Sequence, residues 1–253
     1  MRFVETVMGI PMSIDIRAAD ADAGASADAA AAAFAMMADA DRRFSVYRDD
    51  SEVSLVNRGL IGESAFSDEL REVLEIGEAF RVASGGAFRV RASDGRLDTD
   101  GVVKGWAASR AAGVLLSCGV SDFCLNAGGD VVVGGSPGDG AAWNVGIRSP
   151  SDPARMLAVL SVTDCAVATS GAYERGRHIV DGRTGLPATG LTSATVVADD
   201  LTTADVLATS VFALGPDGVG WAMAQGATGV LALTDAGAPL AAGTLPFARP
   251  RRD

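Results

Sequence analysis

The stretch that decides the fold class is Phe123-Cys124-Leu125-Asn126-Ala127-Gly128-Gly129-Asp130-Val131-Val132-Val133-Gly134. Apolar and β-branched residues fill 123–126 and 130–134, which predicts two strands. The diglycine between them marks a place where the backbone can approach a ligand or another strand closely. Working outward, the same kind of pattern predicts further strands at 143–147, 156–162, 194–197 and 229–234.

Helical patterns surround these strands, and they are predicted at 26–43, 67–83, 105–117, 203–214 and 217–225. Residues 3–17 are predicted to form a strand with a turn signal at Gly9-Ile10-Pro11. Because helices and strands do not alternate strictly, an α+β fold with mixed or antiparallel sheets and packed helices is favoured over a doubly wound parallel sheet. No repeat or linker divides the sequence, so we expect one domain over residues 1–253.

The composition argues against several classes of protein. In 253 residues, 32 Asp and Glu outweigh 21 Lys and Arg, and the net charge of -11 leads us to expect no nucleic-acid partner. No stretch reaches about 18 apolar residues, so no membrane insertion is expected. Three cysteines without a CxxC pair, and an N-terminus without a signal-peptide pattern, favour a cytoplasmic protein with reduced thiols. An anionic ligand would therefore need a local cationic site.

Common catalytic fingerprints do not occur in this sequence. It has neither a GxGxxG after its first strand nor a GxxxxGK[ST]. Gly134-Gly135-Ser136-Pro137-Gly138 matches GxSxG, but a nucleophile elbow needs a helix directly after the serine, and turn residues follow here. We interpret this segment as a hairpin loop.

The single histidine, His178, lies among arginines in the sequence, at Arg175, Arg177 and Arg183. Such a local cationic patch is what an anionic ligand would need in an acidic protein. The alternative is a structural or surface histidine. The surrounding charges favour a site for a phosphate ligand.

A second candidate segment is Leu97-Asp98-Thr99-Asp100-Gly101-Val102-Val103-Lys104-Gly105. Free amides at the start of the predicted helix could bind phosphate, Gly101 could let a ligand approach the backbone, and Lys104 would supply a positive charge. An ordinary polar loop between a strand and a helix explains this segment about equally well.

A third candidate is the pair Asp205 and Thr209, which lie four residues apart on one face of a predicted helix. Two oxygen ligands one turn apart suit Mg2+, which completes its coordination with phosphate and water. The competing interpretation is a capping box, in which Thr202 caps the helix and Asp205 merely stabilises its start. Without other context, the cap is favoured.

In combination and in this order, these segments resemble the ApbE family of flavin transferases, which move FMN from FAD onto a Ser or Thr of an acceptor protein with Mg2+. The resemblance covers most of the chain. Its matching blocks are Met8-Gly9, residues 44–54, Leu97-Asp98 with Lys104-Gly105, residues 126–130, residues 143–147, Thr169-Ser170-Gly171, residues 178–181 with 183–185, and Ala204-Asp205 with Ala208-Thr209.

The resemblance implies a role for particular residues. Those implied to contact FAD are Met8, Tyr47, Asp98, Lys104, His178 and Ile179, with the stretch Ala87-Phe88-Arg89 less firmly indicated. Those implied to bind Mg2+ are Asp205, Thr209 and the carbonyl group of Gly101. The family fold is an α+β arrangement of two pseudo-symmetric halves of sheet and helices, similar to T-fold enzymes.

The chemistry implied is an Mg2+-dependent transfer of FMN from FAD to an acceptor flavoprotein, with release of AMP. His178 is the candidate base that takes the proton of the acceptor hydroxyl, or it orients the nucleotide, and Lys104 would neutralise a phosphate oxygen. Asp205 would be catalytic through the metal. The alternatives are an FAD pyrophosphatase that releases FMN and AMP, and an FAD-binding protein without catalytic activity.

Three features depart from the family pattern. Arg89 follows Phe88 where the family usually has Asp, and the loop of a few tens of residues before Leu-Asp is shortened to 90–96. Gly182 follows Asp181 where the family typically has Pro, and we expect this change to loosen the loop. The leader common in secreted members is missing, in keeping with the cytoplasmic expectation.

Overall fold

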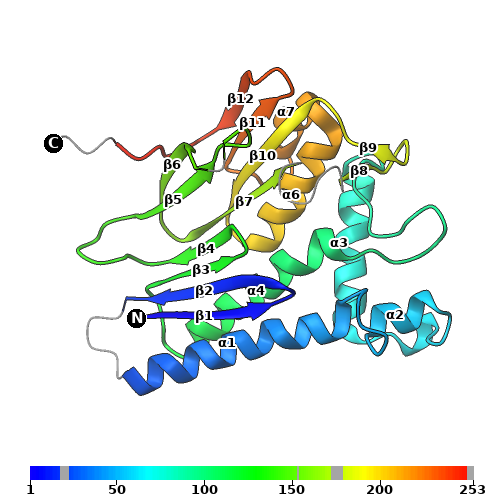
Figure 1. Ribbon diagram of the computed structural model, residues 1–253, viewed down its shortest axis with the longest axis horizontal. Helices are drawn as coiled ribbons and strands as arrows, with labels where there is room; N and C mark the ends of the chain where they lie inside the picture. Colours follow the sequence, from blue (N-terminus) through cyan, green and yellow to red (C-terminus); the bar gives the residue numbers. More distant parts are fainter. Residues whose placement is uncertain (18–22, 153, 172–178, 250–253) are drawn as a thin grey trace.

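The computed structural model describes residues 1–17, 23–152, 154–171 and 179–249. Within these residues, eight strands form an antiparallel sheet in the order β1-β2-β3-β4-β7-β10-β11-β12 (Figure 1). The strands are β1 (Arg2–Val7), β2 (Ile10–Ile16), β3 (Phe123–Ala127), β4 (Asp130–Gly134), β7 (Cys165–Gly171), β10 (Leu191–Ala198), β11 (Gly229–Thr234) and β12 (Pro239–Gly243).

The sheet consists of two halves with the same order of elements. In each half, two paired strands are followed by helices and then by two more paired strands. The halves meet where β4 pairs with β7, with Val132 opposite Ala166. The structure therefore confirms the α+β fold with antiparallel strands and packed helices. The repeated order of elements agrees with the two halves implied by the resemblance.

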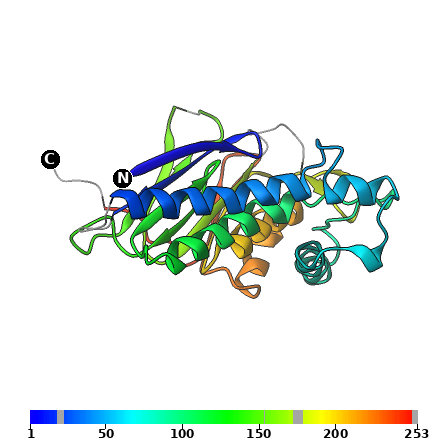
Figure 2. The same cartoon turned by 90° about the horizontal axis from the view of Figure 1, so that it is seen from below.

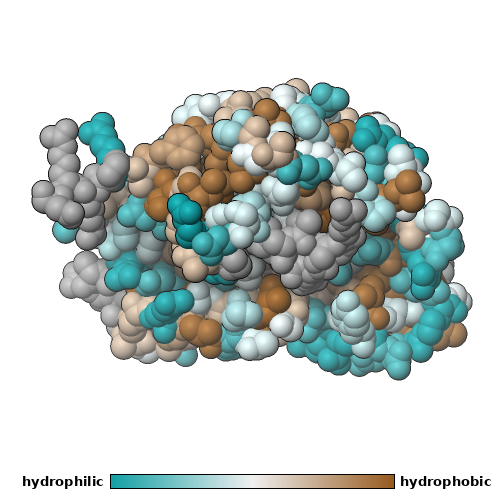
Figure 3. All heavy atoms as spheres, turned by 45° about the horizontal axis from the view of Figure 1, so that its top comes forward, coloured by the Kyte–Doolittle hydropathy of each residue, from teal (hydrophilic) through white to brown (hydrophobic). Residues whose placement is uncertain are grey.

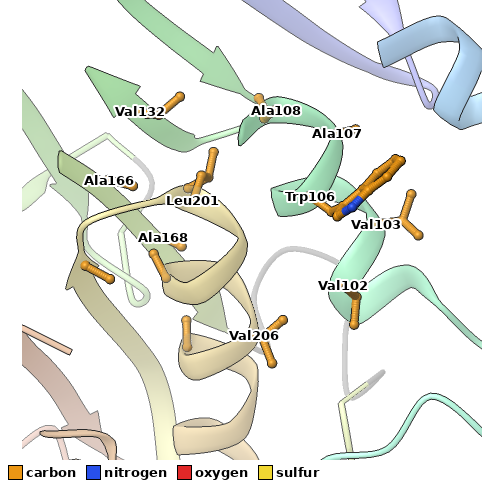
Figure 4. Close-up of a cluster of buried hydrophobic side chains, with 14 of the residues drawn as sticks. Val102, Val103, Trp106, Ala107, Ala108, Val132, Ala166, Ala168, Leu201 and Val206 are labelled. Carbon is orange, nitrogen blue, oxygen red and sulfur yellow. The ribbon is translucent and has the colours of Figure 1, made fainter. Parts of the chain in front are cut away.

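Three long helices cover one face of the sheet (Figure 2). They are α1 (Ala23–Phe44), α4 (Asp100–Ser117) and α6 (Leu201–Leu214), and α4 packs against both of the others. Their inner faces are rich in alanine and valine, and they meet small residues of the sheet such as Ala166 and Ala168 (Figure 4). Small side chains let the helices lie close to the strands, which is why this core is dense without many aromatic residues.

On the opposite face of the sheet, the hairpin of β5 (Trp143–Arg148) and β6 (Met156–Val162) packs over the central strands β4, β7, β10 and β11. Strand residues alternate between the two faces. Val132 therefore joins the core under the helices, whereas Val131 and Val133 pack with the hairpin. The buried Trp143 fixes the hairpin, because its Nε1 donates to the Gly134 carbonyl at 3.0 Å.

The other described elements complete the ends of the sheet. They are α2 (Glu52–Asn57), η1 (Glu63–Ala65), α3 (Asp68–Ala83), β8 (Val180–Asp181), β9 (Leu186–Pro187), η2 (Gly215–Asp217) and α7 (Gly218–Met223). Glu52 ties α2 to α3, since its carboxylate accepts from both the N–H and the hydroxyl of Ser67, which also caps α3. Figure 1 places α2, α3 and the β8–β9 hairpin together at one end of the sheet, and Figure 3 shows a mostly hydrophilic surface toward the lower right, below that end.

The segment Leu201–Met223 is long and apolar enough to cross a membrane by length and composition alone. In the structure it is divided among α6, η2 and α7, and α6 lies against the sheet with most of its side chains buried. Its apolar character is that of a core helix. The length criterion by itself is weak evidence for a membrane span.

Several sequence predictions of local structure need correction. The predicted strand 3–17 is a hairpin, β1 and β2, that turns at Met8-Gly9. The predicted helix 105–117 begins five residues earlier, at Asp100. Gly134 is the last residue of β4, and residues 135–138 form a loop as predicted, but this loop does not close a hairpin, because β4 and β5 belong to different sheets. Strands β7, β8, β9 and β12 and helix α2 were not predicted, and α1 begins at Ala23, inside the expected connection 18–25.

Candidate active site at the seam of the two halves

A buried charge cluster lies where β4, α4 and α6 meet. The Lys104 ammonium, on the second turn of α4, is 2.5 Å from Asp130 Oδ2 and 3.4 Å from Asp205 Oδ1. Both carboxylates are only 3% exposed. Lys104 is therefore not at the mouth of a helix, as the sequence suggested, but inside a site to which each half of the sheet contributes a carboxylate.

Gly105 allows α4 and α6 to approach closely enough to form this site. A Cβ atom at position 105 would lie 2.5 Å from the Leu201 carbonyl oxygen and 2.7 Å from the Asp205 Cβ. At this approach the Gly105 N–H donates to Asp205 Oδ2 at 2.9 Å. Burial raises the pKa of the Asp205 carboxyl well above its ordinary value; the Lys104 charge opposes that rise and the Asp130 charge adds to it.

The three residues implied to bind a metal converge in the structure. Thr209 lies one helical turn beyond Asp205, and its hydroxyl is 3.1 Å from the Ser170 hydroxyl. Gly101 faces Thr209 across the helix contact, since a Cβ added at Gly101 would lie 3.8 Å from Thr209 Cγ2. Asp205, Thr209 and the Gly101 carbonyl offer oxygen donors of the kind that Mg2+ prefers.

This donor set fits a divalent cation for two reasons. The buried Asp205 carboxylate already lies beside a positive charge, the Lys104 ammonium. The Asp205 carboxylate is also held toward α4, because the Gly105 N–H donates to its Oδ2. No group of three His, Cys, Asp or Glu side chains suited to a metal occurs in the described part of the chain, so such a site would depend on hydroxyl, carbonyl and ligand oxygens.

The capping interpretation of Asp205 is wrong. The N-cap of α6 is Asp200, whose carboxylate accepts from the Thr203 N–H at 3.0 Å and from the Thr203 hydroxyl at 2.6 Å. Asp205 lies a full turn inside the helix and is turned toward α4. Asp205 therefore does not cap the start of α6.

Two of the residues predicted to contact FAD, Met8 and Asp98, lie next to elements that reach this site. Met8 occupies the β1–β2 turn with a positive φ of 54°. The neighbouring β3–β4 turn is close to it, since a Cβ at Gly128 would lie 2.5 Å from Ile10 Cδ1. Asp98 is exposed just before α4 and accepts from the Asp100 N–H at 3.3 Å. These positions are open to a ligand.

The remaining predicted contacts differ widely in exposure. Tyr47, just after α1, is 88% exposed, so its side chain is accessible from solvent. Ala87 and Phe88 are buried, and Phe88 packs edge-on against Phe80 and beside Gly101. Ile179 is 9% exposed. A contact of the Ala87 or Phe88 side chain with FAD would require these groups to be uncovered. In the structure, the Phe88 ring instead packs beside Gly101 at the start of α4.

His178, Arg175 and Arg177 lie outside the described residues. Of the predicted cationic patch, the structure therefore describes only Arg183. Its guanidinium forms a two-pronged ion pair with Asp181, with Nε and Nη2 each 2.9 Å from a carboxylate oxygen. This pair holds the pKa of Asp181 below its usual value. The positive charge of Arg183 is thus already paired with the Asp181 carboxylate.

The shortened segment after Phe88 is compact. An isolated bridge joins Arg91 to Leu97, and Gly95 makes the turn between them with a φ of 86°. Asn57 fixes the end of the segment, because its amide group exchanges two hydrogen bonds with the Leu97 backbone. Despite the deletion, these contacts therefore fix the backbone just before α4.

Gly182 does not loosen its loop, contrary to the sequence expectation. Its N–H donates to the Ala87 carbonyl at 2.8 Å, and Arg89 Nη1 donates to its carbonyl at 3.3 Å. A Cβ at this position would lie 2.2 Å from the Gly86 carbonyl oxygen. The absence of a side chain lets the segment around Asp181 pack directly on residues 86–89, and proline would also lack the N–H donor.

Changing Gly182 to alanine is therefore expected to lower the free energy of unfolding by about 1–2 kcal/mol, because the added methyl group forces two backbone segments apart. Urea denaturation followed by circular dichroism measures this. Gly220→Ala is the control, since a Cβ there meets nothing within 4 Å. Equal stability of the two variants would show that the contact at Gly182 has little energetic weight.

Two residues of this site were not predicted from the sequence. Asp130 was noted only as the end of the diglycine segment, and Ser170 only within a matching block. Asp130 had a detectable signal, because a carboxylate begins a strand whose other residues are all buried. The hydroxyl of Ser170 had none, since its partner Thr209 lies 39 residues away in the sequence.

Comparison with known proteins identifies the family that this chain resembles. The model of the ApbE family matches residues 8–94 and 89–233. The FAD:protein FMN transferase of Treponema pallidum is 38% identical over 138 residues, which cover 47% of this chain and 38% of that protein. The FAD:protein FMN transferase of Vibrio cholerae is 32% identical over 131 residues, covering 48% and 39%. Each match thus spans less than half the length of these relatives.

Solved structures share the fold over nearly the whole chain. The flavin transferase ApbE from Vibrio cholerae aligns with a TM-score of 0.81 at 23% identity, covering 95% of this chain and 96% of that one. The ApbE protein from Thermotoga maritima aligns with a TM-score of 0.83 at 22% identity, with the same coverage. These matches show that the chain has the fold of the ApbE flavin transferases. The match to the family model then shows that this chain belongs to the ApbE family.

Proposed function

We propose that this chain is an FAD:protein FMN transferase that depends on Mg2+. The observation that carries the proposal is the convergence of Lys104, Asp205 and Thr209, from two different helices, at the seam of an ApbE-family fold. The relatives named FAD:protein FMN transferase support the same activity. The substrate would be FAD, and the partner an acceptor flavoprotein with a reactive Ser or Thr.

In this proposal the acceptor hydroxyl attacks the FMN phosphorus of FAD. A new P–O bond forms to the acceptor, and the P–O bond to AMP breaks. Mg2+ held by Asp205, Thr209 and the Gly101 carbonyl would supply charge stabilisation to the pyrophosphate oxygens. Lys104 adds a second positive charge at the same place. His178 is proposed either to take the hydroxyl proton or to orient the nucleotide.

Two further points belong to this proposal. The first is that residues 1–253 form one functional domain, and the second is that the protein acts in the cytoplasm. The site draws on both halves of the sheet, which supports the first point. The three cysteines are free, with Cys118 exposed and the other two partly buried, which is compatible with the second.

The test is to incubate the chain with FAD, Mg2+ and a set of flavin-acceptor domains, to denature the mixture, and to look for flavin fluorescence on the acceptor band. We expect a fluorescent acceptor and the release of one AMP per flavin attached. Omission of Mg2+, with EDTA added, should abolish both signals.

Three other outcomes are distinguishable in the same experiment. Free FMN and AMP without a labelled acceptor would favour the pyrophosphatase. Bound and intact FAD would favour a binding protein without catalytic activity. Labelling that continues in EDTA would contradict the metal dependence while leaving the transferase in place.

A further inference from the structure

Asp130 is the buried carboxylate that the proposed chemistry does not use. It is the first residue of β4 and is 3% exposed. Its Oδ1 accepts from the Thr169 N–H at 2.8 Å, which fixes the carboxylate to the neighbouring strand β7. Its Oδ2 is 2.5 Å from the Lys104 ammonium. Asp130 is thus a rigid anchor on which the ammonium is held.

The position of Lys104 matters because two cations would compete for Asp205. The Lys104 ammonium lies 3.4 Å from Asp205 Oδ1, clearly farther than from Asp130. A divalent cation at Asp205 would attract the same carboxylate and repel the ammonium, and both effects are strong in a site with little water. The metal can use Asp205 only if the ammonium has another carboxylate to pair with.

We propose that Asp130 is a positioning residue that holds Lys104 away from Asp205 and so leaves Asp205 available to a divalent cation. This inference rests on the metal site of the proposed function. Without the charge of Asp130, the three-quarters-buried Lys104 side chain would turn to Asp205, the other carboxylate with which it forms an ion pair. The effect of Asp130 on the metal therefore passes through Lys104.

The test is a double-mutant cycle on the full chain, with Mn2+ as the probe and the electron paramagnetic resonance signal of free Mn2+ as the measure of binding. The variants are Asp130→Asn, Lys104→Gln and the double variant. Asp130→Asn should weaken Mn2+ binding about five- to tenfold in the presence of Lys104, and less than about twofold in the Lys104→Gln background. This measurement needs neither FAD nor turnover.

A loss by the same factor in both backgrounds would overturn the proposal, because it would mean that Asp130 acts only through its distant negative charge. No loss in either background would overturn it too. Asp130→Ser provides a second uncharged replacement if the asparagine variant does not fold, and thermal unfolding of each variant establishes that it does. Asp130→Glu keeps the charge and should restore most of the affinity.

Asp205→Ala separates this inference from the proposed function. If Mn2+ binding by the wild-type chain does not depend on Asp205, the metal site of the proposed function fails, and the inference fails with it. If binding depends on Asp205 but the cycle shows no coupling, only the role of Asp130 is lost.

Discussion

Replacing Asp205 by asparagine is expected to lower the rate of FMN transfer by roughly 10²–10³-fold while the chain stays folded. The side chain keeps its shape and can still accept from the Gly105 N–H. It loses the negative charge that would hold the cation, and metal stabilisation of phosphoryl transfer is worth several kcal/mol, or about tenfold in rate for each 1.4 kcal/mol. The rate of acceptor labelling at saturating FAD and Mg2+ measures this loss.

The matched control is Asp200→Ala in the same helix. Asp200 caps α6 through Thr203 and does not touch the charge cluster. Its loss should lower the free energy of unfolding by about 1 kcal/mol and leave the transfer rate within about twofold. The opposite pattern, with transfer retained in Asp205→Asn and lost in Asp200→Ala, would make helix stability the requirement and remove Asp205 from the chemistry.

The second large effect is expected at the contact between α4 and α6. Gly105→Ala should lower the free energy of unfolding by about 3 kcal/mol, although alanine is the better helix former by about 1 kcal/mol. The reason is steric, because the new Cβ would lie 2.5 Å from the Leu201 carbonyl oxygen, and backbone cannot move aside as a flexible side chain can. Chemical denaturation measures this change.

Gly113→Ala is the control for this prediction. Gly113 lies in the same helix, and a Cβ there meets nothing within 4 Å. This variant should be as stable as the original chain or more stable by up to about 1 kcal/mol. If both variants gained stability, the close approach of α4 and α6 would be incorrect, and with it the geometry of the site.

Much of the local structure follows from the sequence, because its signals are local. Strands β4, β6 and β11 have the predicted bounds, since β-branched runs end at glycine, proline or polar residues. Helix α3 begins directly after Ser67, whose hydroxyl accepts from the Leu70 N–H as an N-cap. The α+β class with mixed or antiparallel sheets was also predicted, because the helices and strands do not alternate strictly along the chain.

Strand β7 was not predicted for a physical reason. Its sequence, Cys165-Ala166-Val167-Ala168-Thr169-Ser170-Gly171, is poor in large β-branched residues. It is nevertheless central in the sheet, where one face must admit the closely packed α6 and the other the β5–β6 hairpin. Small residues satisfy that packing, but they carry a weak strand signal by themselves.

By itself, the sequence determined the types of the main elements, the fold class, and the identity of Lys104, Asp205 and Thr209 as candidates. It could not decide between a metal ligand and a cap at Asp205, because Asp205 has a suitable spacing both to Thr202 for a capping box and to Thr209 for a metal site. Only the tertiary structure brings Gly105 to Asp205 over a separation of 100 residues and Asp130 to Lys104 over the seam of the sheet. Charged residues that are far apart in the chain form one site because small residues let two helices and a strand pack closely together. The distances between these residues are set by packing and not by local sequence.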